Sequence, residues 1–489
     1  MWYHSTRNSV PMVDSAQAVL QGLAPDGGLY VMTKMPAFDV EACLKKDMLG
    51  QMEQILAAFL PDVGEMAPLV QAAYTDKFDT DEITPTCQVG DMTVLELFHG
   101  PTQAFKDVAL SMLPYLMTAA KTKEKQTEDI LILTATSGDT GKAALCGFQD
   151  VPGMKICVFY PEGGVSPIQR AQMVTQEGKN VKVCGVEGNF DDAQSGVKEI
   201  FSRYRDDAFR KKRGMGLSSA NSINIGRLVP QIAYYFKAYS DLLQRGKIVM
   251  GQEVNFTVPT GNFGDILAGY LAKKMGLPVG KLICASNENC VLTDFLQTGV
   301  YDKRREFHKT ISPSMDILVS SNLERLLYFA TDGDCMQVRE WMESLQKNGI
   351  YTVSQEIMTR IQEDFDCGCC SETEIKETIG SVFQTYGYTM DTHTAVAWKV
   401  AEEYRKRTED NRPMVVLSTA SPFKFPEAVL SALGVEPQGD AFQQMRLLSE
   451  KTGLPVPRPL AELEGKLCRH GDCVRKEEME QFVLQIFSE

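Results

Sequence analysis

The sequence predicts an α/β fold in which two parallel sheets are each covered by helices on both faces. Three observations predict it. Short apolar runs without polar alternation recur along the chain. Most of them are followed by segments with apolar residues three and four positions apart. Loops rich in glycine, serine and threonine join the two. Fully apolar strands belong to sheets that are buried on both faces, and parallel strands need a crossover between them.

The chain of 489 residues is long enough for more than one domain, and its patterns change near residue 91. Before that point the patterns are helical, and we expect an N-terminal helical domain. Beyond it strands and helices alternate, and we expect a large and a small α/β domain. The predicted domains are 1–90 for the N-terminal domain, 91–126 with 225–489 for the large domain, and 127–224 for the small domain.

Six apolar runs predict buried strands, and a helical pattern follows most of them. The predicted strands are 130–134, 156–159, 181–186, 254–258, 282–285 and 415–418. The predicted helices are 141–148, 167–177, 191–204, 226–242, 264–275, 289–298 and 426–433. Residues 300–395 are polar and mostly helical in pattern, so we interpret them as an elaboration of the last α/β unit.

Acidic residues outnumber basic ones, 64 to 50, which gives a formal net charge of −14. Such a balance does not suit a nucleic-acid backbone, because phosphates need clustered lysine and arginine. No apolar run reaches the roughly 18 residues of a membrane span, and the first residues lack the apolar core of a signal peptide. We therefore expect a cytoplasmic protein, or one from an organelle matrix if a targeting segment is missing. We expect no nucleic-acid or membrane partner.

The chain has thirteen cysteines, but their irregular spacing does not indicate a disulfide framework in a protein of this size. One cluster lies in a polar acidic stretch, and a second group of possible metal ligands lies near the C-terminus. The two groups are Cys367, Cys369 and Cys370, and Cys468, His470 and Cys473. Neither group contains the two C-x-x-C pairs of a zinc site, so we predict no metal.

The rest of the chain is organised around the sequence that surrounds Lys106. The apolar run 94–98 leads into His-Gly-Pro-Thr, and Lys106 then begins a helical pattern. The positive end of a helix dipole disfavours an ammonium group there. A lysine that must lose its proton to form an imine gains from such a position. A lone lysine would more simply extend along the helix end, so the other motifs must decide between the two interpretations.

Three polar loops open helices, and two of them, 134–142 and 259–265, follow strands. In 134–142 the glycines and hydroxyl residues leave amide groups free to hold a carboxylate or phosphate, although a capped helix entry explains that pattern equally well. In 218–227 several polar side chains precede Arg227, which suits a phosphate or carboxylate clamp. In 259–265, Pro-Thr-Gly-Asn-Phe-Gly-Asp, backbone amides can surround a phosphate.

A fourth motif, 418–425, places hydroxyl residues at the end of an apolar strand, where one of them can meet a ring nitrogen. By itself it is an ordinary turn. Together the motifs supply a lysine that can form an imine, a glycine loop that can hold a phosphate, a carboxylate loop and a late hydroxyl group. This is the set of groups that pyridoxal phosphate needs.

The motifs HGPTQAFKD, TSGDTGKAA, NSINIGR, PTGNFGD and STASPFKF resemble those of threonine synthase, in the same order, across about residues 90–425. The stretches YHSTRN and APDGGLYV fit as well. Threonine synthase is a pyridoxal-phosphate enzyme of fold type II, and this chain looks like its longer microbial and fungal form. The resemblance implies a fold like the β subunit of tryptophan synthase, with the cofactor in a cleft between two α/β domains.

The resemblance also implies a role for each motif. Lys106 is expected to hold the cofactor as a Schiff base, and Thr419 to face the pyridine nitrogen. The implied phosphate cup consists of Gly261, Asn262, Phe263, Gly264 and Asp265. The implied substrate-binding residues are Ser137, Gly138, Asp139 and Thr140, beside the substrate carboxylate and the cofactor edge, and Asn221, Ser222 and Arg227, beside the substrate phosphate.

The implied reaction converts O-phospho-L-homoserine and water to L-threonine and phosphate, the last step of threonine biosynthesis, in a monomer or homodimer. One departure from the family pattern is Ser421, where a histidine is usual. Two alternatives stay open. Vertebrate threonine-synthase-like proteins resemble this pattern and act as phospho-lyases that convert O-phosphothreonine to 2-oxobutyrate, ammonia and phosphate. The other alternative, a cofactor-binding protein without turnover, is opposed by the intact Lys106 and phosphate cup.

Overall fold

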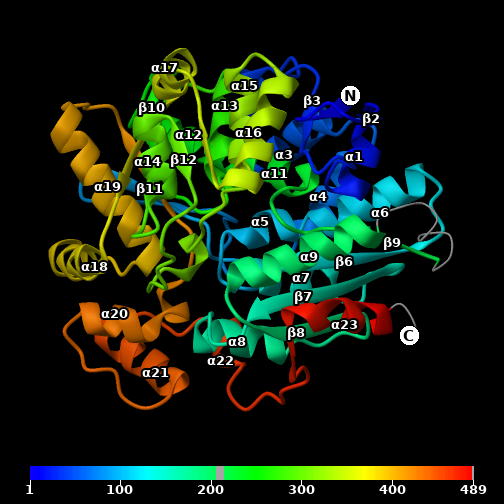
Figure 1. Ribbon diagram of the computed structural model, residues 1–489. Coiled ribbons are helices and arrows are strands. Elements are labelled where there is room, and N and C mark those ends of the chain that lie inside the picture. The colour runs from blue at the N-terminus through cyan, green and yellow to red at the C-terminus, as the bar shows by residue number, and fades with distance from the viewer. Residues whose placement is uncertain (205–213, 487–489) are drawn as a thin grey trace.

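Two largely parallel sheets, each buried beneath helices on both faces, form the body of the molecule, and the α/β prediction is confirmed (Figure 1). The computed structural model describes residues 1–204 and 214–486. The parts of the predicted domains that fall on 205–213 and 487–489 lie outside the described residues. The six predicted strands and the seven predicted helical segments are present, with ends that differ by a few residues, and the predicted helix 226–242 is divided into two α-helices joined by a 3₁₀ turn.

The larger sheet has the strand order β14-β11-β10-β15-β5-β4, and β4 alone runs antiparallel to its neighbour. Its strands are β4 (Thr86–Val89), β5 (Met92–Glu96), β10 (Val254–Pro259), β11 (Val279–Ser286), β14 (Phe365–Cys369) and β15 (Met414–Ser418). Alternate residues of β11 enter different cores: Ile283 packs under α19 (Thr392–Thr408), and Leu282 packs under α13 (Gly264–Lys274). The inner strands β10 and β15 are buried along their whole length because helices cover both faces of the sheet there, whereas β4 and β14 at the edges are partly exposed.

Other helices and short elements surround this sheet. They are α11 (Ile225–Leu228), η1 (Val229–Gln231), α12 (Ile232–Gln244), α14 (Val291–Thr298), β12 (Val300–Asp302), η2 (Pro313–Met315), α15 (Leu323–Ala330), α16 (Cys335–Asn348), β13 (Ile350–Thr352), α17 (Gln355–Asp364), α18 (Glu372–Tyr386), η3 (Pro422–Lys424), α20 (Pro426–Ala432), α21 (Ala441–Thr452) and α22 (Arg458–Ala461). The segment 300–395, expected to be mostly helical, therefore also contributes an edge strand, β14, and the antiparallel pair β12–β13.

The smaller sheet is entirely parallel, with the order β16-β8-β7-β6-β9. Its strands are β6 (Asp129–Ala135), β7 (Met154–Pro161), β8 (Val181–Glu187), β9 (Met215–Ser218) and β16 (Asp472–Arg475). Its helices are α5 (Lys106–Leu110), α6 (Leu113–Lys123), α7 (Asp139–Phe148), α8 (Pro167–Val174), α9 (Phe190–Tyr204) and α23 (Met479–Ile486), with the short η4 (Lys476–Glu478). Ile132 of β6 packs on the α7 side and Leu133 on the α9 side.

The C-terminal chain returns to the smaller sheet, although the sequence-based domains assigned all of 225–489 to the larger one. Strand β16 pairs with β8, and α23 packs against α9. Figure 1 shows α23, in red, beside the smaller sheet. β16 is short and largely exposed, and its sequence therefore contains no apolar run that would predict a strand. Its place is decided by pairing with a partner far away in the sequence.

The N-terminal segment contains the helices α1 (Ser15–Gln21), α2 (Val40–Leu44), α3 (Met48–Phe59) and α4 (Met66–Tyr74). It also contains a three-stranded antiparallel sheet, of β1 (Trp2–Ser5), β2 (Val13–Asp14) and β3 (Tyr30–Met32), which the helical patterns did not indicate. Its apolar residues join one continuous core with α6 and α12. None of the described helices is long and apolar enough to cross a membrane.

His99 fastens the loop that leads from β5 to Lys106. Its Nδ1 lies 2.9 Å from Asp79 Oδ1, and its Nε2 lies 2.8 Å from Glu96 Oε2. Burial alone lowers the pKa of this imidazole, but the hydrogen bonds to the two carboxylates outweigh burial and raise the pKa to about 9. The protonated ring donates to both carboxylates and so ties the end of β5 to the segment around Asp79.

Replacing His99 with glutamine is expected to lower the free energy of unfolding by about 1–2 kcal/mol at pH 6 and by much less at pH 10. An unfolded histidine titrates near about pH 6.5. The stabilisation is therefore complete below that pH and is lost as the pH rises through about 9. Urea unfolding at the two pH values measures the effect, and an equal loss at both would contradict it. His4→Gln is the control, because burial lowers the pKa of His4 and reverses the direction of the pH dependence.

Candidate active site

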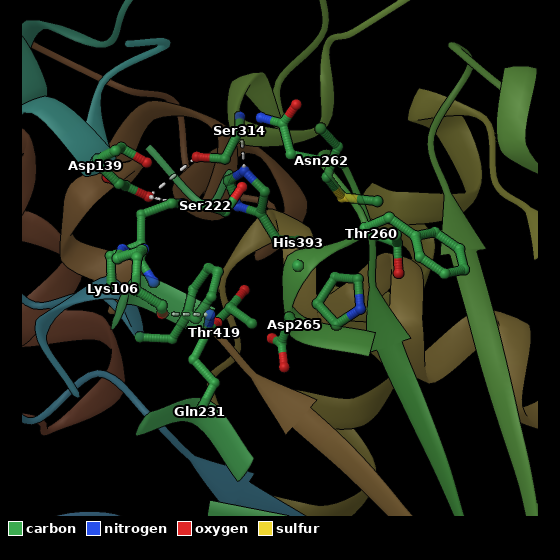
Figure 2. Close-up of a pocket in the computed structure, with 18 residues that line it drawn as sticks. Lys106, Asp139, Ser222, Gln231, Thr260, Asn262, Asp265, Ser314, His393 and Thr419 are labelled. Carbon is green, nitrogen blue, oxygen red and sulfur yellow. Dashed lines mark hydrogen bonds and ion pairs between the residues drawn. The ribbon is translucent and has the colours of Figure 1, made fainter. Parts of the chain in front are cut away.

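Strands of both sheets end at a cleft of about 600 Å³ (Figure 2). β10 and β15 end on one side, and α7 begins on the other. The cleft is lined by Phe105, Lys106, Asp139, Thr140, Ser222, Arg227, Gln231, Pro259, Thr260, Gly261, Asn262, Phe263, Gly264, Asp265, Ser314, Met315, His393 and Thr419. Ligands of parallel α/β folds bind at this end of the strands.

Lys106 is the first residue of α5 and projects into the cleft. Its side chain is 12% exposed, and its Nζ lies 3.7 Å from Asp139 Oδ2 and 4.5 Å from the centre of the Phe105 ring. Burial is the main cause that lowers its pKa to about 8, while the nearby Asp139 carboxylate opposes the shift. A lysine in this state supplies an uncharged amine much more readily than a surface lysine does.

The backbone between Thr102 and Phe105 is held against the segment that follows β15. The Phe105 N–H donates to Thr419 O at 2.9 Å, and Ala104 forms an isolated bridge with Ala420. Thr419 is therefore placed beside Lys106 by main-chain bonds as well as by its strand. The structure thus brings together Lys106 and Thr419, which the sequence analysis assigned to one site although they are far apart along the chain.

The loop after β10 passes close to its neighbours and opens α13. A Cβ atom on Gly261 would lie 2.7 Å from Ser314 O, and Phe263 has a left-handed backbone with φ of 60°. The first amide groups of α13 have no intrahelical partner, and they suit an anion. The buried Asn262 Oδ1 and Asp265 Oδ2 have no hydrogen-bond partner among the described residues. Both of these atoms are acceptors and cannot bind a phosphate, so the loop suits a phosphate cradle only through its close packing and the free amide groups of α13.

Asp265 has a second function in the structure, because its Oδ1 accepts hydrogen bonds from Tyr234 at 2.5 Å and from Tyr235 at 3.0 Å. Burial raises its pKa to about 6, although the two tyrosine hydroxyls oppose the shift. A carboxylate repels a phosphate, so any contribution of this residue to the cradle must come from its main chain. Its side chain anchors the start of α13 to α12.

Arg227 of α11 lines the cleft as a buried guanidinium, only 2% exposed. No described residue accepts a hydrogen bond from its Nε or Nη1. Burial lowers its pKa to about 10. A buried cation without partners is costly for a folded protein. The orphaned donors therefore fit a site whose ligand is an anion.

Asp139, the first residue of α7, also lines the cleft and is held from several sides. Its Oδ1 lies 2.6 Å from Lys424 Nζ and accepts from Gln169 Nε2 at 2.8 Å, and its Oδ2 accepts from Ser314 Oγ at 3.0 Å. Burial alone would raise the pKa of Asp139, but Lys424 and then Lys106 outweigh it, and the pKa lies far below its ordinary value. Asp139 is therefore a permanent anion.

The structure places eleven of the fourteen sequence-predicted site residues in the lining of the cleft. The other three are Ser137, Gly138 and Asn221. Asn221 Nδ2 donates to Ala135 O at 3.0 Å, so this side chain ties its loop to the end of β6. Gly138 has a φ of 128°, and a Cβ there would meet the side chain of Gln169 at 2.4 Å. It allows α8 to approach the start of α7.

The sequence reasoning missed several lining residues, above all His393 and Ser314. His393 Nδ1 lies 2.7 Å from Asp391 Oδ2, and its Nε2 accepts from the Ser314 N–H at 3.2 Å. The two bonds together indicate the tautomer with its proton on Nδ1. Figure 2 shows Asp139, Ser314 and His393 in a row along one wall of the cleft. The only signal in the sequence was a histidine two residues after the capping Asp391.

Known proteins share both the sequence pattern and the fold. Residues 92–420 match the family described as pyridoxal-phosphate dependent enzyme. Residues 2–74 match the threonine synthase N terminus, and residues 394–469 match the C-terminal part of threonine synthase. The fold, the buried lysine and the anion cradle thus define a pyridoxal-phosphate-dependent enzyme of fold type II, whose cofactor is pyridoxal phosphate.

Relatives narrow the family further. The chain is 39% identical to threonine synthase from Pseudomonas aeruginosa, over 96% of this chain and 99% of the relative. It is 37% identical to human threonine synthase-like 1, over 100% of this chain and 68% of that protein. The crystal structure of PLP-bound threonine synthase from Brucella melitensis superposes with a TM-score of 0.84 at 38% identity, covering both chains completely. The chain belongs to the family of threonine synthases and threonine synthase-like proteins.

Among the described residues no group of three or more His, Cys, Asp and Glu side chains has an arrangement that could hold a metal ion. The two groups considered in the sequence lie on different sheets. Cys367 and Cys369 are in β14 of the larger sheet, whereas Cys473 is in β16 of the smaller one.

Proposed function

We propose that the protein is a threonine synthase, a carbon–oxygen lyase that acts on a phosphate ester and converts O-phospho-L-homoserine and water to L-threonine and phosphate. The observation that carries this proposal is the buried guanidinium of Arg227, which lacks partners for two of its donors and faces the same cleft as Lys106. A site with an amine and an unpaired buried cation suits a substrate with both an amino group and a phosphate.

The chain supplies residues that suit the cofactor. In this proposal Lys106 holds pyridoxal phosphate covalently, the main chain of 261–265 surrounds its phosphate, and Thr419 meets the ring nitrogen. When bound, the cofactor supplies an electron sink for the carbon next to the substrate amine. Thr419 offers a hydroxyl group instead of a carboxylate, which favours an uncharged ring nitrogen.

The remaining work belongs to the protein side chains. Lys106 Nζ, once the substrate amine has replaced it, takes a proton from the substrate α carbon and later acts at the β carbon. Arg227 and Ser222 hold the phosphate group, and they favour its departure because the guanidinium and the hydroxyl group donate hydrogen bonds that stabilise the negative charge developing on it. Asp139 and Thr140 lie at the start of α7, beside the expected position of the substrate carboxylate.

A phospho-lyase that acts on O-phosphothreonine remains the second candidate, because Ser421 replaces a usual histidine and the human relative is a threonine synthase-like protein. The surroundings of Ser421 favour the synthase. Its Oγ accepts from the Phe423 N–H at 3.4 Å, its side chain is 1% exposed, and it does not line the cleft. His393 provides an imidazole in the cleft instead.

The test is to incubate the purified protein separately with O-phosphohomoserine and O-phosphothreonine and to measure phosphate, threonine and 2-oxobutyrate. Threonine from phosphohomoserine, lost in the Lys106→Ala variant, is the expected result. Formation of 2-oxobutyrate and ammonia from phosphothreonine alone would overturn the proposal in favour of the lyase. Binding of pyridoxal phosphate with no product from either substrate would indicate a protein without turnover.

We also propose a small phosphorylated amino acid as the substrate that binds beside the cofactor, no nucleic-acid or membrane partner, and a monomer or homodimer in the cytoplasm as the working state. Sedimentation of the purified protein tests the first part of that state, since a tetramer or larger assembly would contradict it.

A further inference from the structure

Lys424 is a completely buried lysine that the proposed reaction does not use. It ends the short helix η3, its side chain is 0% exposed, and it does not line the cleft. Its Nζ lies 2.6 Å from Asp139 Oδ1 and donates to Thr102 O at 3.0 Å. Lysine is almost never fully buried unless it is paired, so the contact with Asp139 accounts for its presence as a charged group.

The Asp139 carboxylate is shared between two lysines. Lys424 Nζ lies 2.6 Å from one oxygen, and Lys106 Nζ lies 3.7 Å from the other. Ser314 and Gln169 donate to the same carboxylate and fix its orientation between the two amines. The single negative charge of Asp139 thus interacts with the amines of two lysines, and the amine of Lys424 is the closer one.

We propose that Lys424 is a positioning residue for the reaction: its ammonium group pairs with Asp139, so that Asp139 does not hold Lys106 as an ammonium ion. The inference rests on the proposed function of Lys106 as the lysine that carries the cofactor. A carboxylate alone beside Lys106 would favour its protonated form, which cannot form an imine. The second contact of Lys424, with Thr102 O, also fixes the backbone four residues before Lys106.

The other charged groups around Lys106 are compatible with this function. They are Arg227 from α11 and Asp265 from α13. The charge of Arg227 lowers the pKa of Lys106, as that of Lys424 does, whereas the charge of Asp265 raises it, as that of Asp139 does. Burial and these charges together lower the pKa of Lys106 to about 8. Removing the charge of Lys424 leaves Asp139 with Lys106 as its only close cationic partner among the described residues.

The experiment measures the reactivity of Lys106 in the full-length, cofactor-free protein. An amine acylating reagent is applied at a series of pH values, and mass spectrometry follows the peptide that contains Lys106. In Lys424→Met the midpoint of labelling should rise by about one pH unit, and labelling at pH 7 should fall about tenfold. Lys424→Arg keeps the charge, and its midpoint should stay near that of the unchanged protein. In the loaded enzyme, the pH dependence of the absorbance of the lysine-bound cofactor should change only in Lys424→Met.

Removing the carboxylate separates the effect of charge from that of packing. In Asp139→Asn the midpoint should fall, because Lys424 then faces Lys106 without an intervening anion. In the double variant Asp139→Asn with Lys424→Met, it should lie above that of Asp139→Asn. An unchanged midpoint in a folded Lys424→Met, or equal midpoints in the single Asp139 variant and the double variant, would overturn the proposal. If Lys424→Met does not fold, the comparison of Asp139→Asn with the double variant still tests the proposal.

If the proposed function of Lys106 is wrong, a different experiment shows it. If Lys106→Ala still forms the lysine-bound cofactor, Lys106 is not the attachment site, whatever the labelling shows. A midpoint that responds to Lys424 as expected would then establish the charge coupling without the catalytic assignment.

Discussion

Replacement of Lys106 with alanine is expected to reduce phosphate release from the phosphorylated amino-acid substrate by about 10³-fold or more. Lys106 is the one lysine among the described residues that line the cleft. With a pKa of about 8, about a tenth of its amine is uncharged at pH 7, whereas less than about 0.1% of an ordinary lysine is. The absorbance of the lysine-bound cofactor should disappear together with the activity.

Lys106→Arg is the matched control for this loss. The guanidinium keeps the positive charge beside Asp139 and the packing against the Phe105 ring, but it does not form an imine under these conditions. Its activity should therefore be as low as that of the alanine variant, while its stability should stay close to that of the unchanged protein. A variant that kept the absorbance would move the attachment site elsewhere, with the buried Lys424 as the first candidate.

The strands and the meeting of their loops could be predicted from the sequence for a simple reason. A strand such as β15 is buried on both faces and is therefore apolar up to its last residue, which stands out against the polar loop after it. Parallel strands end at the same edge of a sheet, so the loops that follow β5, β10 and β15 must converge. The convergence of Lys106, Gly261 and Thr419 on one cleft follows from this geometry.

The other wall of the cleft could not be predicted in this way. Ser314 reaches it from η2, a single turn with no preceding parallel strand, and His393 reaches it from the start of α19. Their positions depend on contacts between distant segments, such as the bond from the Ser314 N–H to His393. Asn221 shows another difficulty: the motif does not reveal that the side-chain amide of this residue donates to a backbone carbonyl, Ala135 O.

Arg227→Met is expected to separate stability from function. The loss of a buried guanidinium that binds a phosphate should lower kcat/KM by about 10²–10³-fold, since a charged contact of this kind is worth about 2–5 kcal/mol. In the cofactor-free protein, however, two of its donors have no partner. Methionine of similar length removes that buried charge, so the free energy of unfolding should stay unchanged or rise by about 1–3 kcal/mol. Urea unfolding of the cofactor-free protein and steady-state kinetics of the loaded enzyme measure the two effects.

Arg325→Met provides the matched comparison, because Arg325 is equally buried but fully engaged. Its Nε donates to Tyr30 O at 3.0 Å and its Nη2 to Ile223 O at 2.6 Å. Removing the guanidinium takes away these two hydrogen bonds to carbonyl groups, so we expect a loss of about 2–4 kcal/mol in the free energy of unfolding. The free energy of unfolding should therefore fall in Arg325→Met and stay unchanged or rise in Arg227→Met, because only Arg325 has hydrogen-bond partners for these donors within the described residues. If Arg227→Met destabilised the cofactor-free protein as much as Arg325→Met does, Arg227 would be a structural residue, and the anion site would have to be sought elsewhere in the cleft.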